Sequence, residues 1–321
     1  MRSRLVHGTS ISLTELSFGG ASLGNLYSVT SEDDSRASIG AAWECGIRYF
    51  DTAPHYGLGL SERRLGAALA EYPRSEWVVS TKVGRLIVAN ENPTRFDSDF
   101  VVPGDLRREW DFSRDGILRS IDDSLARLGT DYLDIVYLHD PDQCEDPRAA
   151  MTGAEALVEL REQGMVRAIG IGSNSVPAVA ALFLQADIDL AMLAGRYTLL
   201  EQDGAAAVFE AAGDRSIVAV GVFNSGLLST PRPLPDSMYD YQPVPGDLYQ
   251  RAHGLADIAE AHAVTLPQAA IAFPLRNPQV VSAAIGMRNA AQVRANVALY
   301  EAGVASSVWD AMQREGFLDP V

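Results

Sequence analysis

Cysteine is scarce in this sequence, which contains two, Cys45 and Cys144, among 321 residues. They lie far apart in the chain, and neither belongs to a Cys-x-x-Cys pair, so the spacing carries no zinc or redox motif. Proteins that depend on disulfides belong to oxidising compartments. We therefore expect a reduced, cytoplasmic protein.

Positive charge is also under-represented. The chain has 26 Lys and Arg residues against 42 Asp and Glu residues, which gives a formal net charge of −16. A nucleic-acid-binding protein needs a basic surface to neutralise phosphates, and an anionic membrane surface attracts basic segments. The charge balance argues against both partners and indicates a solvated acidic surface.

Long apolar runs are missing as well. No segment approaches the length of a membrane span, and the charged residues 1–5 are not followed by the apolar stretch of a signal peptide. We expect neither a leader nor an anchor. Hydrophobic residues still make up 47% of the chain, which is enough for a sizeable core.

What the chain has in abundance is alternation between short strand-like runs and helix-like segments. Such alternation is typical of βαβ units and a parallel sheet. Eight units without a linker favour an α/β fold of the closed (β/α)₈ TIM-barrel type, built as a single domain over residues 1–321. The expected strands lie at 16–18, 47–51, 77–83, 133–139, 166–171, 190–193, 217–222 and 280–285.

Local signals mark several helix ends and two long loops. Ser31, with Asp34 three residues later, predicts the start of a helix that Gly46 can close. The polar segment 90–111 and the proline-rich segment 230–245 are predicted to be loops. Loops of this length in a compact domain are usually functional or mobile, and we expect both to flank the barrel mouth.

Four polar residues follow or end successive strands. Asp51, Lys82 and His139 stand at the ends of the second, third and fourth expected strands, and Tyr56 follows Asp51 closely. The active site of such barrels lies at the carboxyl ends of the strands. The sequence therefore predicts that these four side chains converge, although each one alone is also compatible with a structural role.

These residue types together suit proton transfer at a carbonyl or alcohol. The tyrosine pKa is ordinarily near 10, and a neighbouring ammonium from Lys82 should lower it. Asp51 can pair with Lys82 and keep it protonated. His139 can orient the substrate oxygen, and donors arranged around that oxygen stabilise the negative charge that develops on it.

The same segments resemble the aldo-keto reductase signature. The resemblance covers essentially the whole chain and implies the barrel, NAD- or NADP-linked hydride transfer, no metal, and the four roles given above. Its most specific part is the Asp-Thr-Ala motif with its tyrosine. The matching segments are Gly-Ile-Arg-Tyr-Phe-Asp-Thr-Ala-Pro-His-Tyr-Gly at 46–57, Ser-Glu at 61–62, Thr-Lys-Val at 81–83, Tyr-Leu-His-Asp-Pro at 137–141, and the pattern at 164–170.

Departures from the family pattern point to a subgroup. The family usually places a Ser-Asn pair after strand five, and this role transfers to Ser173 and Asn174. Ala194 stands where a glutamine is usual, and Val220 stands where a stacking tyrosine is usual. With segments 193–201 and 220–226, the chain resembles sugar 1-dehydrogenases, including L-fucose (D-threo-aldose) dehydrogenases, and pyridoxal 4-dehydrogenases. This resemblance implies oxidation of a cyclic hemiacetal to a lactone.

Further cofactor contacts are expected after strands seven and eight. Segment 221–226 could follow a pyrophosphate or be an ordinary turn, and a helix that begins near residue 289 offers an anion-binding N-terminus. Arg288 is the cation expected to read the 2′-phosphate of NADP, in an enzyme that also accepts NAD. The candidate cofactor residues are Gly221, Phe223, Ser225, Gly226, Gly286, Arg288, Gln292 and Asn296.

Trp110, Arg107, Arg196 and Tyr239 are the candidates for the substrate wall, with simple packing as the alternative for the aromatic ones. Three other functions stay open: a general aldehyde or ketone reductase, a non-catalytic regulatory subunit that binds the cofactor, and an aldolase-like enzyme with a Schiff base at Lys82. For each of the catalytic functions, the expected partner is a small-molecule substrate.

Overall fold

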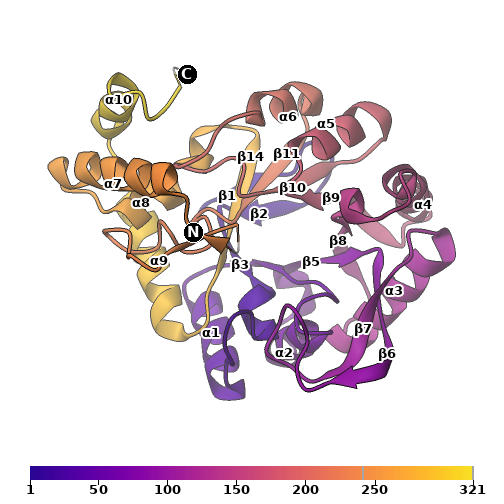
Figure 1. Cartoon of the computed structure of the whole chain (residues 1–321). Helices are drawn as coiled ribbons and strands as arrows, with labels where there is room; N and C mark the ends of the chain where they lie inside the picture. Colours follow the sequence, from indigo (N-terminus) through magenta and orange to yellow (C-terminus); the bar gives the residue numbers. More distant parts are fainter. Residues whose placement is uncertain (241, 320–321) are drawn as a thin grey trace.

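A computed structural model describes residues 1–240 and 242–319. Its centre is a closed barrel of eight parallel strands with helices on the outside (Figure 1). This arrangement confirms the predicted (β/α)₈ barrel. In order around the barrel, the strands are β3 (Leu16–Gly19), β4 (Tyr49–Asp51), β5 (Val78–Val83), β8 (Leu133–His139), β9 (Val166–Ser173), β10 (Leu190–Ala194), β11 (Ser216–Val220) and β14 (Val280–Gly286).

The helices begin and end largely where the sequence signals indicate. The Ser31 side chain accepts the Asp34 amide and caps α1, and Ser113 caps α3, which ends at Gly129 with φ 64°. The α-helices are α1 (Glu32–Glu44), α2 (Leu60–Leu69), α3 (Arg114–Leu128), α4 (Ala149–Glu162), α5 (Val176–Gln185), α6 (Ala205–Ala212), α7 (Gly246–Ala261), α8 (Leu266–Ala272), α9 (Ala290–Ala302) and α10 (Ser306–Arg314). Short 3₁₀ turns are η1 (Gly20–Gly24), η2 (Arg74–Glu76), η3 (Pro141–Gln143) and η4 (Pro274–Arg276).

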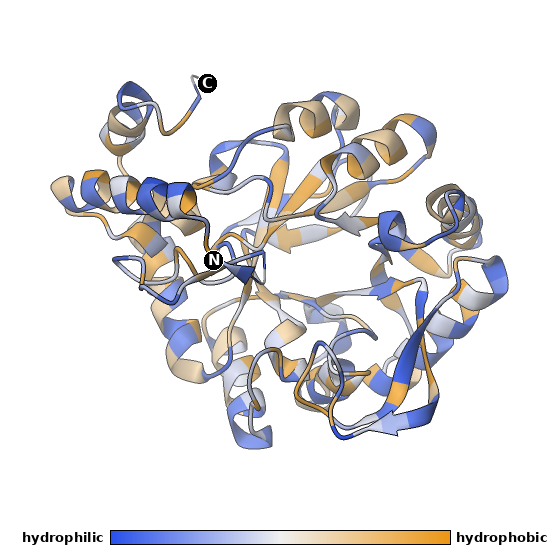
Figure 2. Ribbon diagram, in the orientation of Figure 1, coloured by the Kyte–Doolittle hydropathy of each residue, from blue (hydrophilic) through white to orange (hydrophobic). Residues whose placement is uncertain are grey.

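The apolar core has several parts, and Figure 2 shows hydrophobic residues concentrated on the central strands. The largest part lies between the strands and the surrounding helices, and a second joins α7, α8 and α10. A third fills the barrel interior and includes Val6, Ile11 and Leu13 beside β1 (Ser3–Leu5) and β2 (Ser12–Thr14). This hairpin, which closes the end opposite the mouth, was not predicted because its strands have three residues each.

The segment 90–111 is not the loop that the sequence predicts. Most of it belongs to a long antiparallel hairpin of β6 (Arg85–Thr94) and β7 (Gly104–Trp110), which projects from the barrel (Figure 1). Its polar sequence conceals the strands because both are edge strands of a projecting, largely exposed ribbon and therefore lack the apolar alternation of a half-buried strand. The segment 230–245 does contain irregular chain, with β12 (Met238–Tyr239) and β13 (Gln242–Pro243) inside it; residue 241 lies outside the described residues.

None of the helices in the described part of the chain has the length and apolar character needed to cross a bilayer. Cys45 and Cys144 are both free thiols.

Candidate active site

The four residues predicted from the strand ends come together at the mouth of the barrel. Strands β4, β5 and β8 are neighbours, so their carboxyl ends bring Asp51, Lys82 and His139 side by side. The Lys82 Nζ lies 2.7 Å from Asp51 Oδ2 and 3.0 Å from the Tyr56 hydroxyl. The rings of Tyr56 and His139 are 5.8 Å apart, edge to face. The barrel therefore builds the predicted group.

The three protons of the Lys82 ammonium all have acceptors. One points to the Asp51 carboxylate, one to the Thr52 carbonyl at 3.0 Å, and one to the Tyr56 oxygen at 3.0 Å. An ammonium has three donors and no acceptor, so Lys82 must donate to Tyr56. The proton of Tyr56 itself then points away from Lys82, and Tyr56 lines the main cleft of the molecule.

The balance of charges around Tyr56 corrects one expectation. Burial raises the pKa of Tyr56 and Asp51 adds to this, so the lowering caused by Lys82 does not bring the value below the ordinary one. Burial alone would lower the pKa of Lys82, but Asp51 and Tyr56 raise it. The group is thus a firmly protonated ammonium beside a neutral phenol when the cleft holds no ligand.

His139 is an uncharged hydrogen-bonding group. Burial lowers its pKa well below the ordinary value, and the positive charges of Arg85 and Lys82 lower it further. Its Nε2 is 3.6 Å from Asp140, a carboxylate that Arg85 also holds at 2.5 Å. A neutral imidazole can position a substrate oxygen without competing with Tyr56 for the proton.

His55 is a member of the site that sequence reasoning missed. Its ring lies 5.3 Å from the His139 ring, edge to face. Arg108 of β7 donates hydrogen bonds to the His55 Nδ1 and carbonyl, and burial with the nearby arginines lowers the pKa of His55 to about 2. The quoted motif contained His55, but its arginine partner comes from a hairpin that the sequence did not reveal.

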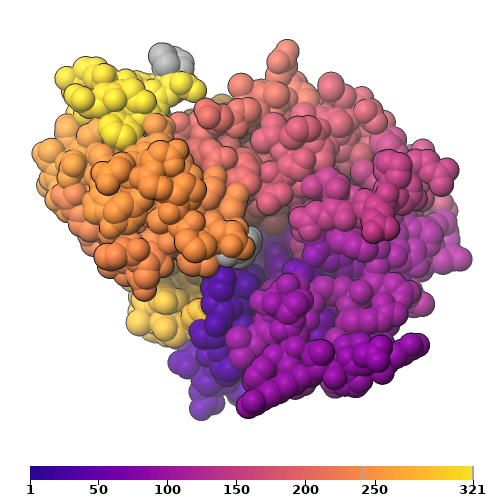
Figure 3. Space-filling view, in the orientation of Figure 1, coloured from indigo at the N-terminus to yellow at the C-terminus, as the bar shows by residue number. Residues whose placement is uncertain are grey.

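A cleft of about 490 Å³ extends from Asp51 and Tyr56 across the barrel mouth to the start of α9. Figure 3 shows the corresponding recess between the indigo N-terminal residues and the orange segment. Eight of the ten predicted cofactor residues line it: Asn174, Gly221, Phe223, Ser225, Gly226, Gly286, Arg288 and Gln292. Ala194 and Val220 line it too, so the departures from the family pattern face this space.

Ser173 and Asn296 do not line the cleft. The Ser173 hydroxyl donates to Asp142 at 2.7 Å and accepts the amide of Ser175, so it is used within its own loop. Asn296 lies one helical turn beyond Gln292 on α9, further from the helix start. In contrast, the turn after β3 at residues 19–22 lines the cleft and was not predicted; a Cβ at Gly20 would stand 2.5 Å from the Asp51 carbonyl oxygen, so this turn needs a glycine.

Arg288 lines the cleft, but its guanidinium is engaged by the protein. It donates to the carbonyls of Leu26 and Ser28 and to the hydroxyl of Thr30. The Arg288 amide donates to Gln292 Oε1 at 2.8 Å. Arg288 therefore ties the segment 26–30 to the start of α9, a role that the sequence did not indicate.

None of the four residues predicted for the substrate wall lines the main cleft. Trp110 stacks on Phe112, and Arg107 pairs with Glu109 at the surface. Arg196 donates to the Tyr239 hydroxyl at 3.2 Å and to the carboxylate of Asp240 at 2.5 Å. Asp240 lines the cleft, whereas Arg196 and Tyr239 do not. These contacts link the loop after β10 to the ribbon of β12 and β13.

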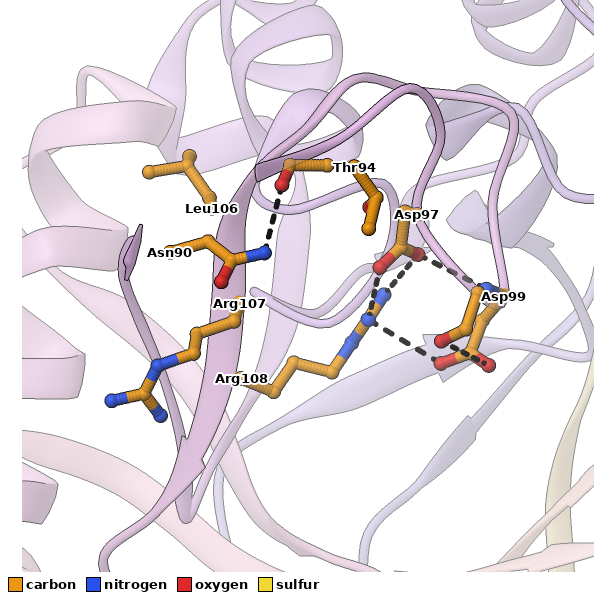
Figure 4. A pocket seen from close by; sticks show the side chains of 9 residues that line it. Asn90, Thr94, Asp97, Asp99, Leu106, Arg107 and Arg108 are labelled. Carbon is orange, nitrogen blue, oxygen red and sulfur yellow. Dashed lines mark hydrogen bonds and ion pairs between the residues drawn. The ribbon is translucent and has the colours of Figure 1, made fainter. Parts of the chain in front are cut away.

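A second cavity, of about 340 Å³, lies at the tip of the β6–β7 hairpin (Figure 4). Figure 4 shows Arg108 directed toward Asp97 and Asp99 while Arg107 points the other way. Arg108 binds both oxygens of Asp97, at 2.6 and 2.8 Å. The cavity holds no group placed for catalysis, and its ion pairs serve to fix Arg108 against His55.

Asn224, which lines the main cleft, carries a hydrogen-bond acceptor that the described protein leaves unused. Asn224 Oδ1 is buried and has no hydrogen-bond partner among residues 1–240 and 242–319. Asn224 adopts a left-handed conformation with φ 46° between Gly221 and Gly226, which also have positive φ. A buried unpaired acceptor is costly unless a ligand satisfies it, so this wall fits a molecule that carries amide or hydroxyl donors, as a nicotinamide dinucleotide does.

A tyrosine, lysine and aspartate at the mouth of a (β/α)₈ barrel, beside a long cleft, define the class of barrel oxidoreductases. Comparison with known proteins agrees: the model of the Aldo/keto reductase family matches residues 15–314. The chain is 46% identical to a D-threo-aldose 1-dehydrogenase of Pseudomonas sp., with 93% of each chain covered. It is 38% identical to a pyridoxal 4-dehydrogenase of Microbacterium luteolum, covering 98% of this chain and 97% of that one.

A solved structure of an aldo-keto reductase from Bacillus halodurans, in its holo form, has a TM-score of 0.77 and 28% identity, and the match covers 98% of this chain and 96% of that one. The chain therefore belongs to the aldo/keto reductase family and is an NAD(P)-dependent oxidoreductase.

Proposed function

We propose that this enzyme oxidises the hemiacetal carbon of a cyclic substrate to a lactone, with L-fucose, another threo-configured aldose or pyridoxal as the substrate. The observation that carries the proposal is the hydrogen bond from Lys82 to Tyr56 at the edge of the cleft. It leaves the Tyr56 oxygen supported by a cation, which is what a group that takes a proton from an alcohol requires. The names of the two relatives support the substrate class.

Each residue of the group has a separate task. Asp51 holds Lys82 as an ammonium, and Lys82 stabilises the phenolate of Tyr56. The phenolate accepts the proton of the substrate hydroxyl, while the neutral His139 positions the same oxygen. A bound nicotinamide supplies the acceptor for the hydride that leaves the carbon. The proton and the hydride together account for both hydrogens lost in forming the carbonyl.

NAD is the proposed cofactor, held by the wall at residues 221–226 and the segment from Gly286 to the start of α9. The 2′-phosphate of NADP needs a cationic partner, and Arg288 already donates to three oxygens of the segment 26–30. Arg294 of α9 pairs with Glu44 at the surface. Reading the 2′-phosphate through Arg288 therefore requires Arg288 to leave its partners.

A screen of aldoses and pyridoxal with NAD⁺ and NADP⁺ tests the proposal. We expect NADH formation with a threo-configured aldose or pyridoxal, and a lactone as the product by NMR. A parallel screen of simple aldehydes and ketones with NADH covers general carbonyl reduction. Activity confined to this second screen would overturn the hemiacetal proposal and favour a general reductase.

A further inference from the structure

A line of buried hydroxyl groups runs from the interior of the barrel to Asp51. Ser80 Oγ donates to Asp51 Oδ1 at 2.7 Å, and the Tyr49 hydroxyl lies 2.9 Å from Ser80 Oγ. The hydroxyl of Tyr137 follows, 3.3 Å from that of Tyr49. Ser80, Tyr49 and Tyr137 are completely buried. The proposed mechanism assigns none of them a role.

Counting protons fixes the direction of every hydrogen bond in this line. Ionised Asp51 can only accept, so the single Ser80 proton is used on Asp51. Tyr49 must then donate to Ser80, and because that uses its one proton, Tyr137 must donate to Tyr49. All three O–H dipoles therefore point their positive ends toward Asp51. Hydrogen bonds in such a series polarise one another.

We propose that Ser80 and Tyr49 are positioning residues for Asp51. Their hydrogen bonds spread the negative charge of the Asp51 carboxylate and keep the group aligned, so that the positive charge of Lys82 acts on Tyr56. The inference rests on the proposed function for the role of Tyr56. The physical reason is a competition at Lys82. A carboxylate that lacks other donors keeps more negative charge and binds Lys82 more strongly, which weakens the stabilisation of the phenolate.

The signs of the pKa effects agree with this competition. Burial raises the pKa of Asp51, and the hydrogen bonds from Lys82 and Ser80 act in the opposite direction. Lys82 lowers the pKa of Tyr56, whereas Asp51 and Asp140 raise it. The other titratable or charged groups facing Tyr56 are the rings of His55 and His139 and the guanidinium of Arg85, and none of them touches the hydroxyl line.

Tyr49→Phe tests the inference because it removes one hydroxyl and keeps the ring that fills the barrel. Tyr137→Phe is the matched control: it is also buried, but its hydroxyl lies one step further from Asp51. Ser80→Ala removes the direct donor, and Ser80→Thr restores it. The ionisation of Tyr56 is followed in isotope-labelled tyrosine by the NMR shift of its phenol carbon, assigned with Tyr56→Phe, without substrate or cofactor.

We expect Tyr49→Phe and Ser80→Ala to move the Tyr56 titration to more alkaline pH by about half a pH unit or more. Tyr137→Phe should move it less, and Ser80→Thr should resemble the wild type. The inference would be overturned if the Tyr56 titration were unchanged or more acidic in both Tyr49→Phe and Ser80→Ala. If these variants only had a lower melting temperature, Ser80 and Tyr49 would have a packing role. Failure of the wild type to oxidise any aldose or pyridoxal overturns the proposed function but does not alter this readout.

Discussion

Lys82 organises the site because its three donors have three different acceptors. Two of them bind the end of β4, through Asp51 and the Thr52 carbonyl, and the third binds Tyr56. The lysine is thereby held in one geometry, and the phenol of Tyr56 is held with it. Removing Lys82 or Tyr56 should therefore affect proton transfer more than the binding of the cofactor.

Replacing Tyr56 by Phe removes the group proposed to take the substrate proton. We expect kcat to fall by about 10²–10⁴, the usual contribution of general acid–base catalysis. Binding of NAD⁺, followed by calorimetry, should stay close to that of the wild type because the hydroxyl is not needed to hold the cofactor. A kcat near the wild-type value would refute the mechanism.

Lys82→Met removes the ammonium while keeping a chain of similar length. In the oxidative direction Tyr56 must be deprotonated, so the rate should rise with pH until its phenol ionises. Burial already raises the pKa of Tyr56 and Lys82 opposes that rise. The variant should have a lower kcat and a kcat/KM profile displaced to alkaline pH by about 1–3 pH units. Superimposable wild-type and variant profiles would contradict this role.

At the level of elements, the β6–β7 hairpin completes the site from outside the barrel. Its strand β7 supplies Arg108, which contacts His55 and is fixed by Asp97. Strand β6 begins with Arg85, which binds Asp140 next to His139. Both imidazoles of the mouth therefore depend on arginines of one hairpin.

Arg108→Leu should release His55 and disturb its edge-to-face contact with His139. We expect kcat/KM to fall about tenfold, which corresponds to roughly 1.4 kcal/mol of transition-state stabilisation. Arg107→Leu is the control, because Arg107 is the neighbouring residue of β7 and pairs with Glu109 at the surface. Equal losses in the two variants would mean that the hairpin acts only through its general stability.

Arg288 also connects two elements of the structure, because it ties the segment 26–30 to the start of helix α9. If Arg288 mainly anchors this segment, Arg288→Ala should raise the Kd of NAD⁺ and NADP⁺ together, by about tenfold, as expected for lost charged hydrogen bonds. Arg294→Ala, which removes an exposed ion pair with Glu44, should change neither. A selective loss of NADP⁺ binding would instead support the sequence-based expectation that Arg288 reads the 2′-phosphate.

For the whole molecule, the two imidazoles of the mouth link stability to pH. Burial lowers the pKa of both His55 and His139, whereas in the unfolded chain each titrates near 6.5. The unfolded state therefore binds more protons below that pH, and stability must fall as the pH drops through 6.5 toward the low folded values. Asp51 and Asp140, whose pKa values burial raises, oppose this trend at more acidic pH.

Urea unfolding between pH 7.5 and 5.5 measures this linkage. We expect the free energy of unfolding to fall by about 1.4 kcal/mol across this whole pH range for each of the two histidines, because each unfolded imidazole titrates near 6.5. His55→Phe keeps an aromatic ring and should halve the slope. A free energy of unfolding that stays constant from pH 7.5 to 5.5 would contradict the neutral, buried state of these imidazoles.

Much of the architecture was predictable from local patterns. The βα alternation predicted the barrel, and the Ser31 cap marked the start of α1, because these signals act between residues close in sequence. Strand ends of neighbouring strands must meet at one edge, so the convergence of Asp51, Lys82 and His139 also followed from the sequence.

Other features depended on contacts between distant segments. The partners of Arg288 lie about 260 residues away in the chain, and Arg108 reaches His55 from a hairpin whose polar sequence resembles a loop. The direction of the Tyr56 pKa was likewise decided by tertiary structure, because burial depends on everything packed around the phenol and not on the lysine alone. The amino-acid sequence by itself determined which chemical groups meet at the mouth; the folded chain decided which of their hydrogen bonds and charges are already used, since that depends on distances that no local pattern contains.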